Sequence, residues 1–168
     1  MRGLLFSLSL LLALPTLAVE LSITTNIPRL NVAEYHRPYV AFWLEQDGQH
    51  RLDLAVWYDL NMKDNEGNTW LKDMRQWWRK SGRSLDMPVD GLSGATRAPG
   101  QHTQVFTVDN SELNSLPAGE YQLVVEASRE VGGREMVKIP LQWPPTAPQT
   151  HSASGNAELG EVQLHLQP

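Results

Sequence analysis

The hydroxyl of Thr96 is the side chain whose surroundings in the sequence best suit covalent chemistry. It ends the run DGLSGAT at residues 90–96, where Gly94 and Ala95 leave room for a second enzyme to reach the oxygen. A threonine hydroxyl on a flexible segment can accept a phosphoester, and the adjacent Arg97 could pair with the negative charge that the ester keeps. We therefore expect Thr96 to project into solvent. The alternative is a tight surface turn in which the small residues only let the chain reverse.

The sequence gives little support to other kinds of reactive site. Its 5 histidines show no H-x-H or H-x-x-x-H spacing, so no metal site is expected. Ser93, His102 and Asp90 supply the residue types of a hydrolase triad, but the sequence contains no G-x-S-x-G elbow. The absence of cysteine excludes thiolate zinc sites, iron–sulfur clusters and redox-active cysteine pairs.

The composition indicates one acidic globular domain. The chain has 168 residues, of which 41% are hydrophobic and 20% are charged. Its 14 Lys and Arg against 19 Asp and Glu give a net charge of −5. Such a balance argues against a protein that binds nucleic acid without regard to sequence, because that function requires a cationic surface.

Residues 1–18 have the pattern of a secretory signal peptide. Arg2 precedes an apolar run from Leu4 to Leu14, and Ala18 is a small residue at a suitable cleavage point. The run is shorter than the ~20 residues that a spanning helix needs, and an uncleaved membrane anchor is the alternative. The sequence therefore predicts an exported protein that is not itself membrane-spanning.

Hydrophobic periodicity predicts a mainly β fold. Alternating or β-branched runs separated by turn residues indicate strands at 20–27, 37–45, 51–58, 102–108, 122–129 and 135–143. Tyr121, in the spacing L-x-x-G-x-Y, is typical of the tyrosine corner of Greek-key sandwiches. The pattern favours an immunoglobulin-like β-sandwich of about seven strands over residues 19–143, and a small open barrel is the alternative.

One helix, one long loop and a C-terminal extension complete the expected organisation. The stretch Thr69–Ser81 carries apolar side chains at helical spacing, which predicts an inserted amphipathic helix. Residues 83–100 lack periodicity and contain several Gly and Pro, so they indicate a long Gly-rich loop of the kind that often carries function. The Pro- and Ser-rich residues 144–156 indicate a linker, and the alternation within 157–168 predicts a C-terminal edge strand.

The run at 90–96 resembles the D-x-x-[ST]-G-A-T signature at which FAD:protein FMN transferases attach FMN covalently. The same signature occurs in flavin-carrying subunits of sodium-pumping NADH:quinone oxidoreductases. The resemblance implies that Thr96 takes FMN through a phosphoester and that Asp90 and Ser93 are recognition positions. It also implies that Gly94 and Ala95 let the active site of the transferase close over the hydroxyl.

Two further features bear on a flavin bound in this way. Trp77 and Trp78 cannot both face the core of one helix, so one of them is a candidate to stack on the isoalloxazine ring. Backbone N–H groups of the Gly-containing turn, together with Arg97, could hold the phosphodiester.

Most of the chain, about residues 21–143, is similar to a family of predicted periplasmic proteins catalogued as domain of unknown function 2271. Residues 93–100 and 119–135 carry most of the likeness, along with the runs RPYVAFWLEQDG and WLKDMRQWW. Members tend to be encoded near FMN transferases and PepSY-type membrane reductases. The resemblance therefore implies a periplasmic location and these two classes of protein as partners.

These patterns together predict a periplasmic electron-transfer flavoprotein that carries FMN on Thr96 and uses the β-sandwich as a rigid holder. Because the flavin does the redox chemistry, we expect a redox carrier without catalytic acid–base residues. The alternative is a cofactor-free exported binding or interaction module of the same fold.

Overall fold

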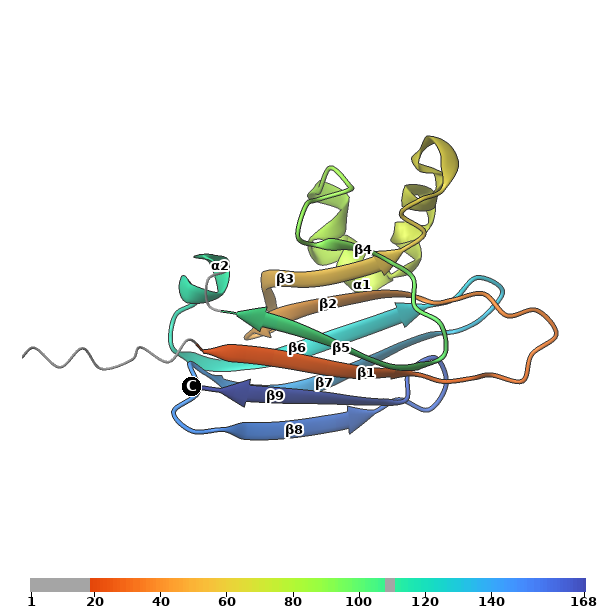
Figure 1. The fold of residues 1–168 in the computed structure, drawn as a ribbon. Helices are drawn as coiled ribbons and strands as arrows, with labels where there is room; N and C mark the ends of the chain where they lie inside the picture. Colours follow the sequence, from red (N-terminus) through yellow and green to blue (C-terminus); the bar gives the residue numbers. More distant parts are fainter. Residues whose placement is uncertain (1–18, 108–110) are drawn as a thin grey trace, which may run out of the picture.

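Two β-sheets pack face to face in the computed structural model, which describes residues 19–107 and 111–168 (Figure 1). One sheet has the strand order β5 (Gly100–Thr107), β1 (Glu20–Ile27), β9 (Glu161–Gln167) and β8 (Gln149–Ser154). The other has the order β4 (Ser93–Ala95), β3 (Gln49–Tyr58), β2 (Tyr39–Gln46), β6 (Gly119–Ser128) and β7 (Arg134–Trp143).

The predicted β-sandwich is confirmed, with 9 strands among the described residues where about seven were expected. Neighbouring strands are antiparallel except for β3 and β4, which are parallel. A short helix, α2 (Ser111–Asn114), follows β5. Within the described residues no helix has both the length and the apolar character needed to cross a membrane. The expected signal peptide, residues 1–18, lies outside the described part of the chain.

The first core lies between the two sheets. Strands β1 and β9 supply every second side chain to it, among them Leu21, Ile23 and Leu164. Burial of each such side chain contributes roughly 1.5–3 kcal/mol relative to its exposure. At one end of the sandwich the Tyr121 hydroxyl donates a 2.8 Å hydrogen bond to the carbonyl oxygen of Pro117, which confirms the predicted tyrosine corner.

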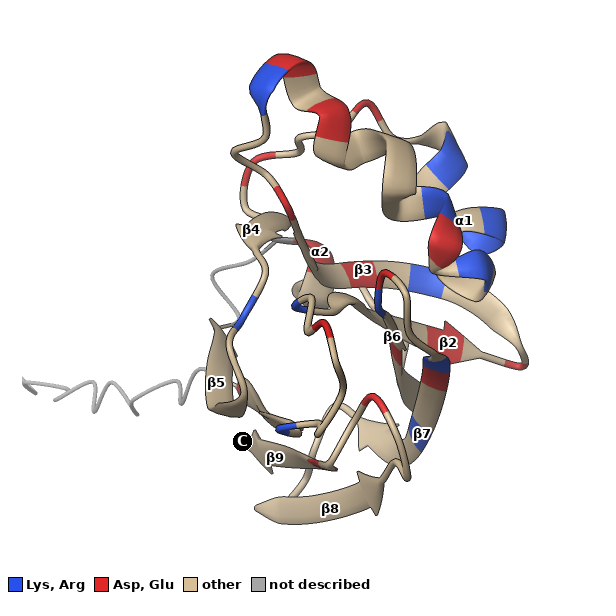
Figure 2. Ribbon diagram, turned by 90° about the vertical axis from the view of Figure 1, so that its right-hand side faces the viewer, with Lys and Arg blue, Asp and Glu red and all other residues tan. Residues whose placement is uncertain are grey.

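A second core covers the outer face of the five-stranded sheet. It lies beneath an insertion at residues 60–92, which contains η1 (Lys63–Asp73), α1 (Arg75–Lys80) and η2 (Gly82–Ser84). Figure 2 shows the insertion as a third layer above the two sheets, with several Lys and Arg residues around α1. Strand β2 serves both cores, because Phe42 faces the first and Trp43 the second. Its continuous apolar run therefore reflects burial on both faces.

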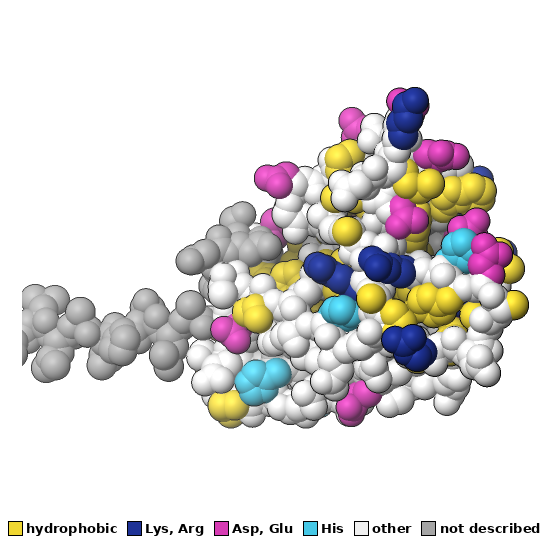
Figure 3. Space-filling model, turned by 45° about the vertical axis from the view of Figure 1, so that its right-hand side comes forward, with side chains coloured by type: hydrophobic (Ala, Val, Ile, Leu, Met, Phe, Trp, Pro, Cys, Tyr) yellow, Lys and Arg dark blue, Asp and Glu magenta, His cyan; other side chains and the backbone are white. Residues whose placement is uncertain are grey.

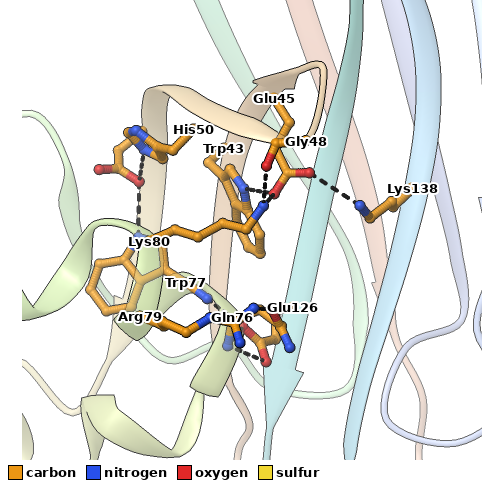
Figure 4. Close-up of polar contacts among 11 residues, drawn as sticks. Trp43, Glu45, Gly48, His50, Gln76, Trp77, Arg79, Lys80, Glu126 and Lys138 are labelled. Atoms are coloured by element: carbon orange, nitrogen blue, oxygen red, sulfur yellow. Dashed lines mark hydrogen bonds and ion pairs between the residues drawn. The ribbon is translucent and has the colours of Figure 1, made fainter.

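Glu126 on β6 holds the insertion against the sheet (Figure 4). Its carboxylate is 1% exposed and accepts hydrogen bonds from the backbone N–H groups of Gln76, at 3.0 Å, and Trp77, at 2.8 Å. These groups belong to the first turn of α1, where N–H groups have no partner within the helix. A carboxylate is also favoured there by the helix dipole.

The helix predicted over Thr69–Ser81 is interrupted. Residues up to Asp73 complete a 3₁₀-helix, and only Arg75–Lys80 is α-helical. Met74 between them has φ −78° and ψ 74°, outside the helical region. The contact of the following N–H groups with Glu126 outweighs the local preference for one continuous helix.

The C-terminal part of the chain also differs from the expectation. Residues 149–154, inside the predicted linker, form β8, which is one of the two edge strands of its sheet. Strand β9, expected at an edge, lies between β1 and β8. The composition of residues 144–156 suits a linker, but pairing with β9 supplies hydrogen-bond partners that no local pattern reveals. The sandwich therefore extends beyond residue 143.

Glu45, at the end of β2, is a second buried carboxylate (Figure 4). It accepts hydrogen bonds from Lys80, at 2.6 Å, Trp43, at 2.9 Å, and Lys138, at 3.1 Å. Burial by itself would raise the pKa of Glu45, but the bonds from Lys80, Trp43 and Lys138 outweigh it and hold the pKa below its ordinary value of 4.5. Since Lys80 lies on α1, this contact also ties the insertion to the sheet.

The Glu45→Gln variant should lose stability mainly above pH 4.5. Because the pKa of Glu45 is lower in the folded protein, its contribution is complete above about pH 4.5 and is lost as the pH falls through the folded-state pKa. We expect Glu45→Gln to lower the free energy of unfolding by about 2–4 kcal/mol at pH 7, with a smaller difference in acid. Urea unfolding over this pH range measures both. Glu161→Gln, at an exposed position, is the control, and an equal loss at every pH would contradict the assignment.

Candidate functional site

The DGLSGAT run ends in an edge strand of the five-stranded sheet. Ser93–Ala95 form β4 and pair in parallel with the end of β3. The N–H of Val56 donates to the carbonyl of Leu92 at 2.8 Å, and the N–H of Thr96 donates to the carbonyl of Tyr58 at 3.1 Å. This part of the loop expected over residues 83–100 is therefore bonded along its length to β3.

The insertion explains why this pair of strands is parallel. Parallel neighbouring strands need a crossover connection of a dozen or more residues. Residues 60–92 supply this connection: they lead from β3 to β4 along the chain and pack on the outer face of the sheet. The carboxyl ends of the two strands consequently lie side by side. Asp59 follows β3 and Thr96 follows β4, so the fold brings these two residues together.

The small residues of the motif have structural roles of their own. A Cβ added to Gly94 would come within 3.3 Å of Cδ1 of Trp57, so the strand lies close to this indole ring. Gly91 has φ of 74°, the left-handed conformation that favours glycine, in the turn before β4. Ala95 is exposed. Packing against Trp57 and the turn before β4 therefore explain why residues 94 and 91 are glycines, independently of any need for access to Thr96.

Within the described residues, no hydrogen bond joins Asp90 or Ser93 to Thr96. The Ser93 hydroxyl accepts the Val89 N–H at 3.0 Å and so fixes the turn before β4. Asp90 is exposed and lines a cavity of about 690 Å³ on which Thr96 does not lie. The two residues expected to act in recognition thus sit at the start of the motif, and the hydroxyl sits at its end.

Thr96 is less accessible than we expected. The residue is only 9% exposed, and its hydroxyl donates a 3.1 Å hydrogen bond to Oδ1 of Asp59. Asp59 itself is exposed, so this bond lies close to the surface. The expectation of a hydroxyl that projects freely into solvent is wrong, because pairing with β3 fixes the backbone of Thr96 beside Asp59.

A cavity of about 680 Å³ opens beside Thr96. Its walls come from the residues before β2, the start of the insertion and the turn after β6. The cavity is lined by Tyr35, His36, Arg37, Tyr39, Asp59, Met62, Glu66, Trp70, Asp73, Thr96, Ser128, Arg129, Glu130 and Val131. A smaller cavity of about 280 Å³ shares Arg37, Asp59, Met62 and Thr96 with it. Thr96 therefore lies on the wall of a space whose volume suits an organic ligand.

Positive and negative groups both surround this space. Figure 3 shows Lys and Arg side chains on the surface where the insertion, at the top of the view, meets the sheets. Arg37 is exposed and lines both cavities beside Thr96. Arg97 is also exposed, and its guanidinium carbon lies 5.4 Å from the ring centroid of Trp57, a cation–π contact. Burial, and then the negative charge of Asp59, raise the pKa of Tyr39 to about 12, so Tyr39 is neutral at physiological pH.

The tryptophan that faces the cavity is Trp70. It is 45% exposed, whereas Trp77 is fully buried and donates its indole N–H to Oδ1 of Asp53 at 2.9 Å. Trp78 packs against the second core, and neither Trp77 nor Trp78 lines the cavity with Thr96. The helical periodicity placed Trp70 on the buried stripe. In the structure Trp70 belongs to η1 instead, and the helix breaks at Met74, after it.

The described residues hold no group of three or more His, Asp or Glu side chains that could bind a metal ion. The cavity beside Thr96 offers aromatic surface, two guanidinium groups and four carboxylates to a ligand. The aromatic surface suits a planar molecule, and the guanidinium groups can donate hydrogen bonds to it. Sequence reasoning missed Arg37, Asp59 and Trp70, which reach the cavity from three separate parts of the chain.

The Thr96→Val variant tests whether the hydroxyl is held by Asp59. Valine keeps the shape but removes the donor, so we expect a loss of about 1 kcal/mol in the free energy of unfolding. Thr96→Ser keeps the hydroxyl and should recover most of this loss. Urea unfolding of the three proteins measures the difference. If valine and threonine are equally stable, the hydroxyl is not held.

Comparison with known proteins gives one match. The family model described as "Predicted periplasmic protein (DUF2271)" matches residues 20–161. This range takes in both sheets from β1 up to the first residue of β9, together with the insertion and Thr96. No curated protein and no solved structure matches the chain.

Proposed function

The chain belongs to the DUF2271 family of predicted periplasmic proteins, and on that premise we propose that it is an electron carrier with FMN esterified to Thr96. The observation that carries the proposal is the run DGLSGAT, whose threonine lines a cavity large enough for a flavin ring. The β-sandwich would position the cofactor and set its exposure and potential.

Loading would be a phosphoryl transfer from FAD, carried out by an FMN transferase. A bond forms between Oγ1 of Thr96 and the phosphorus of the FMN half of FAD. The pyrophosphate bond of FAD breaks, AMP leaves, and the hydroxyl loses its proton. The product is a phosphodiester with one negative charge. Arg97, the next residue in the chain, and Arg37, which lines the same cavity as Thr96, are candidates to pair with it.

Access to the hydroxyl sets a condition on this reaction. The transferase must displace the bond from Thr96 to Asp59 before the oxygen can attack. Asp59 and the neighbouring Met62 are both exposed, so the side of the cavity that must give way is at the surface. Strand β4 is an edge strand, which leaves one side of the motif open to a second protein.

The proposal includes export and two partners. The N-terminal 18 residues would act as a cleavable signal peptide that brings the chain to the periplasm. The FMN transferase would load it there, and a PepSY-type membrane reductase would exchange electrons with the attached flavin. FMN, when bound, supplies the redox chemistry, and the chain supplies attachment, orientation and shielding.

Co-expression with an FMN transferase, followed by mass measurement of the intact protein, tests the proposal. We expect the mass to rise by one FMN less one water. The denatured protein should also keep flavin fluorescence in a gel, since only a covalent flavin survives denaturation. Thr96→Ala should abolish both signals, and Thr107→Ala, an exposed threonine on β5, should leave them unchanged. An unmodified mass, under conditions in which a known acceptor is loaded, would overturn the proposal.

The alternative function is a cofactor-free binding module. The low exposure of Thr96 and its bond to Asp59 favour it, because they give the threonine a structural role without any modification. In that case the cavity would hold a free ligand or a partner side chain. The same mass measurement separates the two, since a binding module would stay unmodified.

A further inference from the structure

Arg129, a residue of the cavity wall, has one buried nitrogen without a hydrogen-bond partner in the described chain. Its side chain is 6% exposed. Nε and Nη2 donate to the carboxylate of Glu158 at 2.8 and 3.1 Å, and together with the Gly133 N–H they satisfy that carboxylate. Nη1 is buried and has no partner among the described residues, and Arg129 lines the cavity beside Thr96.

Tyr35 presents the same situation on the neighbouring loop. Its hydroxyl is buried without a hydrogen-bond partner in the described chain, and the residue lines the same cavity. The guanidinium carbon of Arg129 lies 5.9 Å from the Tyr35 ring centroid, so the two groups are close neighbours. Two orphaned donors in one cavity wall are unfavourable unless a ligand or solvent supplies acceptors.

We propose that this cavity seats the isoalloxazine ring of the attached flavin, an inference that rests on the proposed function. Trp70 would contact the face of the ring, while Arg129 and Tyr35 would donate hydrogen bonds to the carbonyl oxygens of its pyrimidine edge. Thr96, the attachment point, lines the same cavity as Trp70, Arg129 and Tyr35. A flavin attached there would therefore reach these residues inside one cavity.

The charges around the cavity favour this arrangement over an anionic ligand bound deep in the space. Asp59, Glu66, Asp73 and Glu130 also line it and would repel an anion. The oxidised isoalloxazine ring is neutral and presents carbonyl acceptors and an aromatic face. The phosphodiester would stay at Thr96, close to the exposed Arg37. The buried guanidinium of Arg129 is already neutralised by Glu158, so it serves as a donor rather than as a free charge.

Flavin fluorescence in the loaded protein tests the seat. Tryptophan in contact with an isoalloxazine ring quenches its emission, and phenylalanine does so far less. In fully loaded protein we expect emission to be weak and to rise several-fold on unfolding. Trp70→Phe should raise the emission of the folded protein, whereas the same change at Trp78, which does not line the cavity, should not. Equal emission from both variants and the unsubstituted protein would overturn the seat.

Tyr35→Phe provides a second test, the rise in melting temperature on loading. A hydroxyl with only a structural role would not change this rise. Because the hydroxyl has no partner in the described chain, its removal should leave the melting temperature of the unloaded protein unchanged or slightly higher. If the hydroxyl bonds to the ring, the rise in melting temperature on loading should be smaller in Tyr35→Phe than in the unsubstituted protein. An equal rise in both proteins would contradict the bond.

The two proposals fail in different ways. If the mass shows no FMN on the unsubstituted protein, the proposed function itself is wrong. If the mass shows complete loading but the emission of the folded protein equals that of the unfolded protein, FMN is attached at Thr96 and the ring lies outside this cavity.

Discussion

The docking of the insertion on the outer face of the sheet is the constraint on which the rest of the structure depends. Glu126 binds the first N–H groups of α1, and Lys80 on the same helix binds Glu45. Both carboxylates are 1% exposed, so each would be strongly unfavourable if its partner moved away. These contacts, together with the second core, keep residues 60–92 in place as a crossover between β3 and β4.

The position of Thr96 follows from that crossover. A crossover that packs on the sheet returns the chain parallel to β3, and the ends of β3 and β4 then lie side by side. Asp59 and Thr96 meet there, at the edge of a cavity whose other walls come from the loop before β2 and the turn after β6. The crossover therefore both lowers the exposure of Thr96 and places it beside the cavity. The proposed attachment point and the proposed ring seat both follow from this one feature of the fold.

Two kinds of buried polar group serve different purposes in this fold. The carboxylates of Glu45 and Glu126 have several donors each and fix the insertion. Tyr35 and Arg129, which line the cavity with Thr96, retain buried polar atoms without hydrogen-bond partners in the described chain, as do Thr25 and Gln104, which do not line it. Native structures leave few buried donors unsatisfied, and those that remain call for an explanation such as a missing ligand. Because Tyr35 and Arg129 lie close together on one cavity wall, the ring seat is proposed from their unpartnered atoms.

The sequence by itself determined the β-sandwich, most of its strands, the tyrosine corner and the motif that ends at Thr96, because strand alternation and turn residues are local patterns. It did not show that Trp70, rather than Trp77 or Trp78, lines the cavity with Thr96, or that part of residues 144–156 forms a strand, since helical spacing and composition do not show what a segment packs against. Only the tertiary structure decided that β8 pairs with β9, that Met74 interrupts the helix, and that Trp70 faces the cavity. Contacts between distant parts of the chain set these features, and they outweigh the small local preferences on which sequence patterns depend.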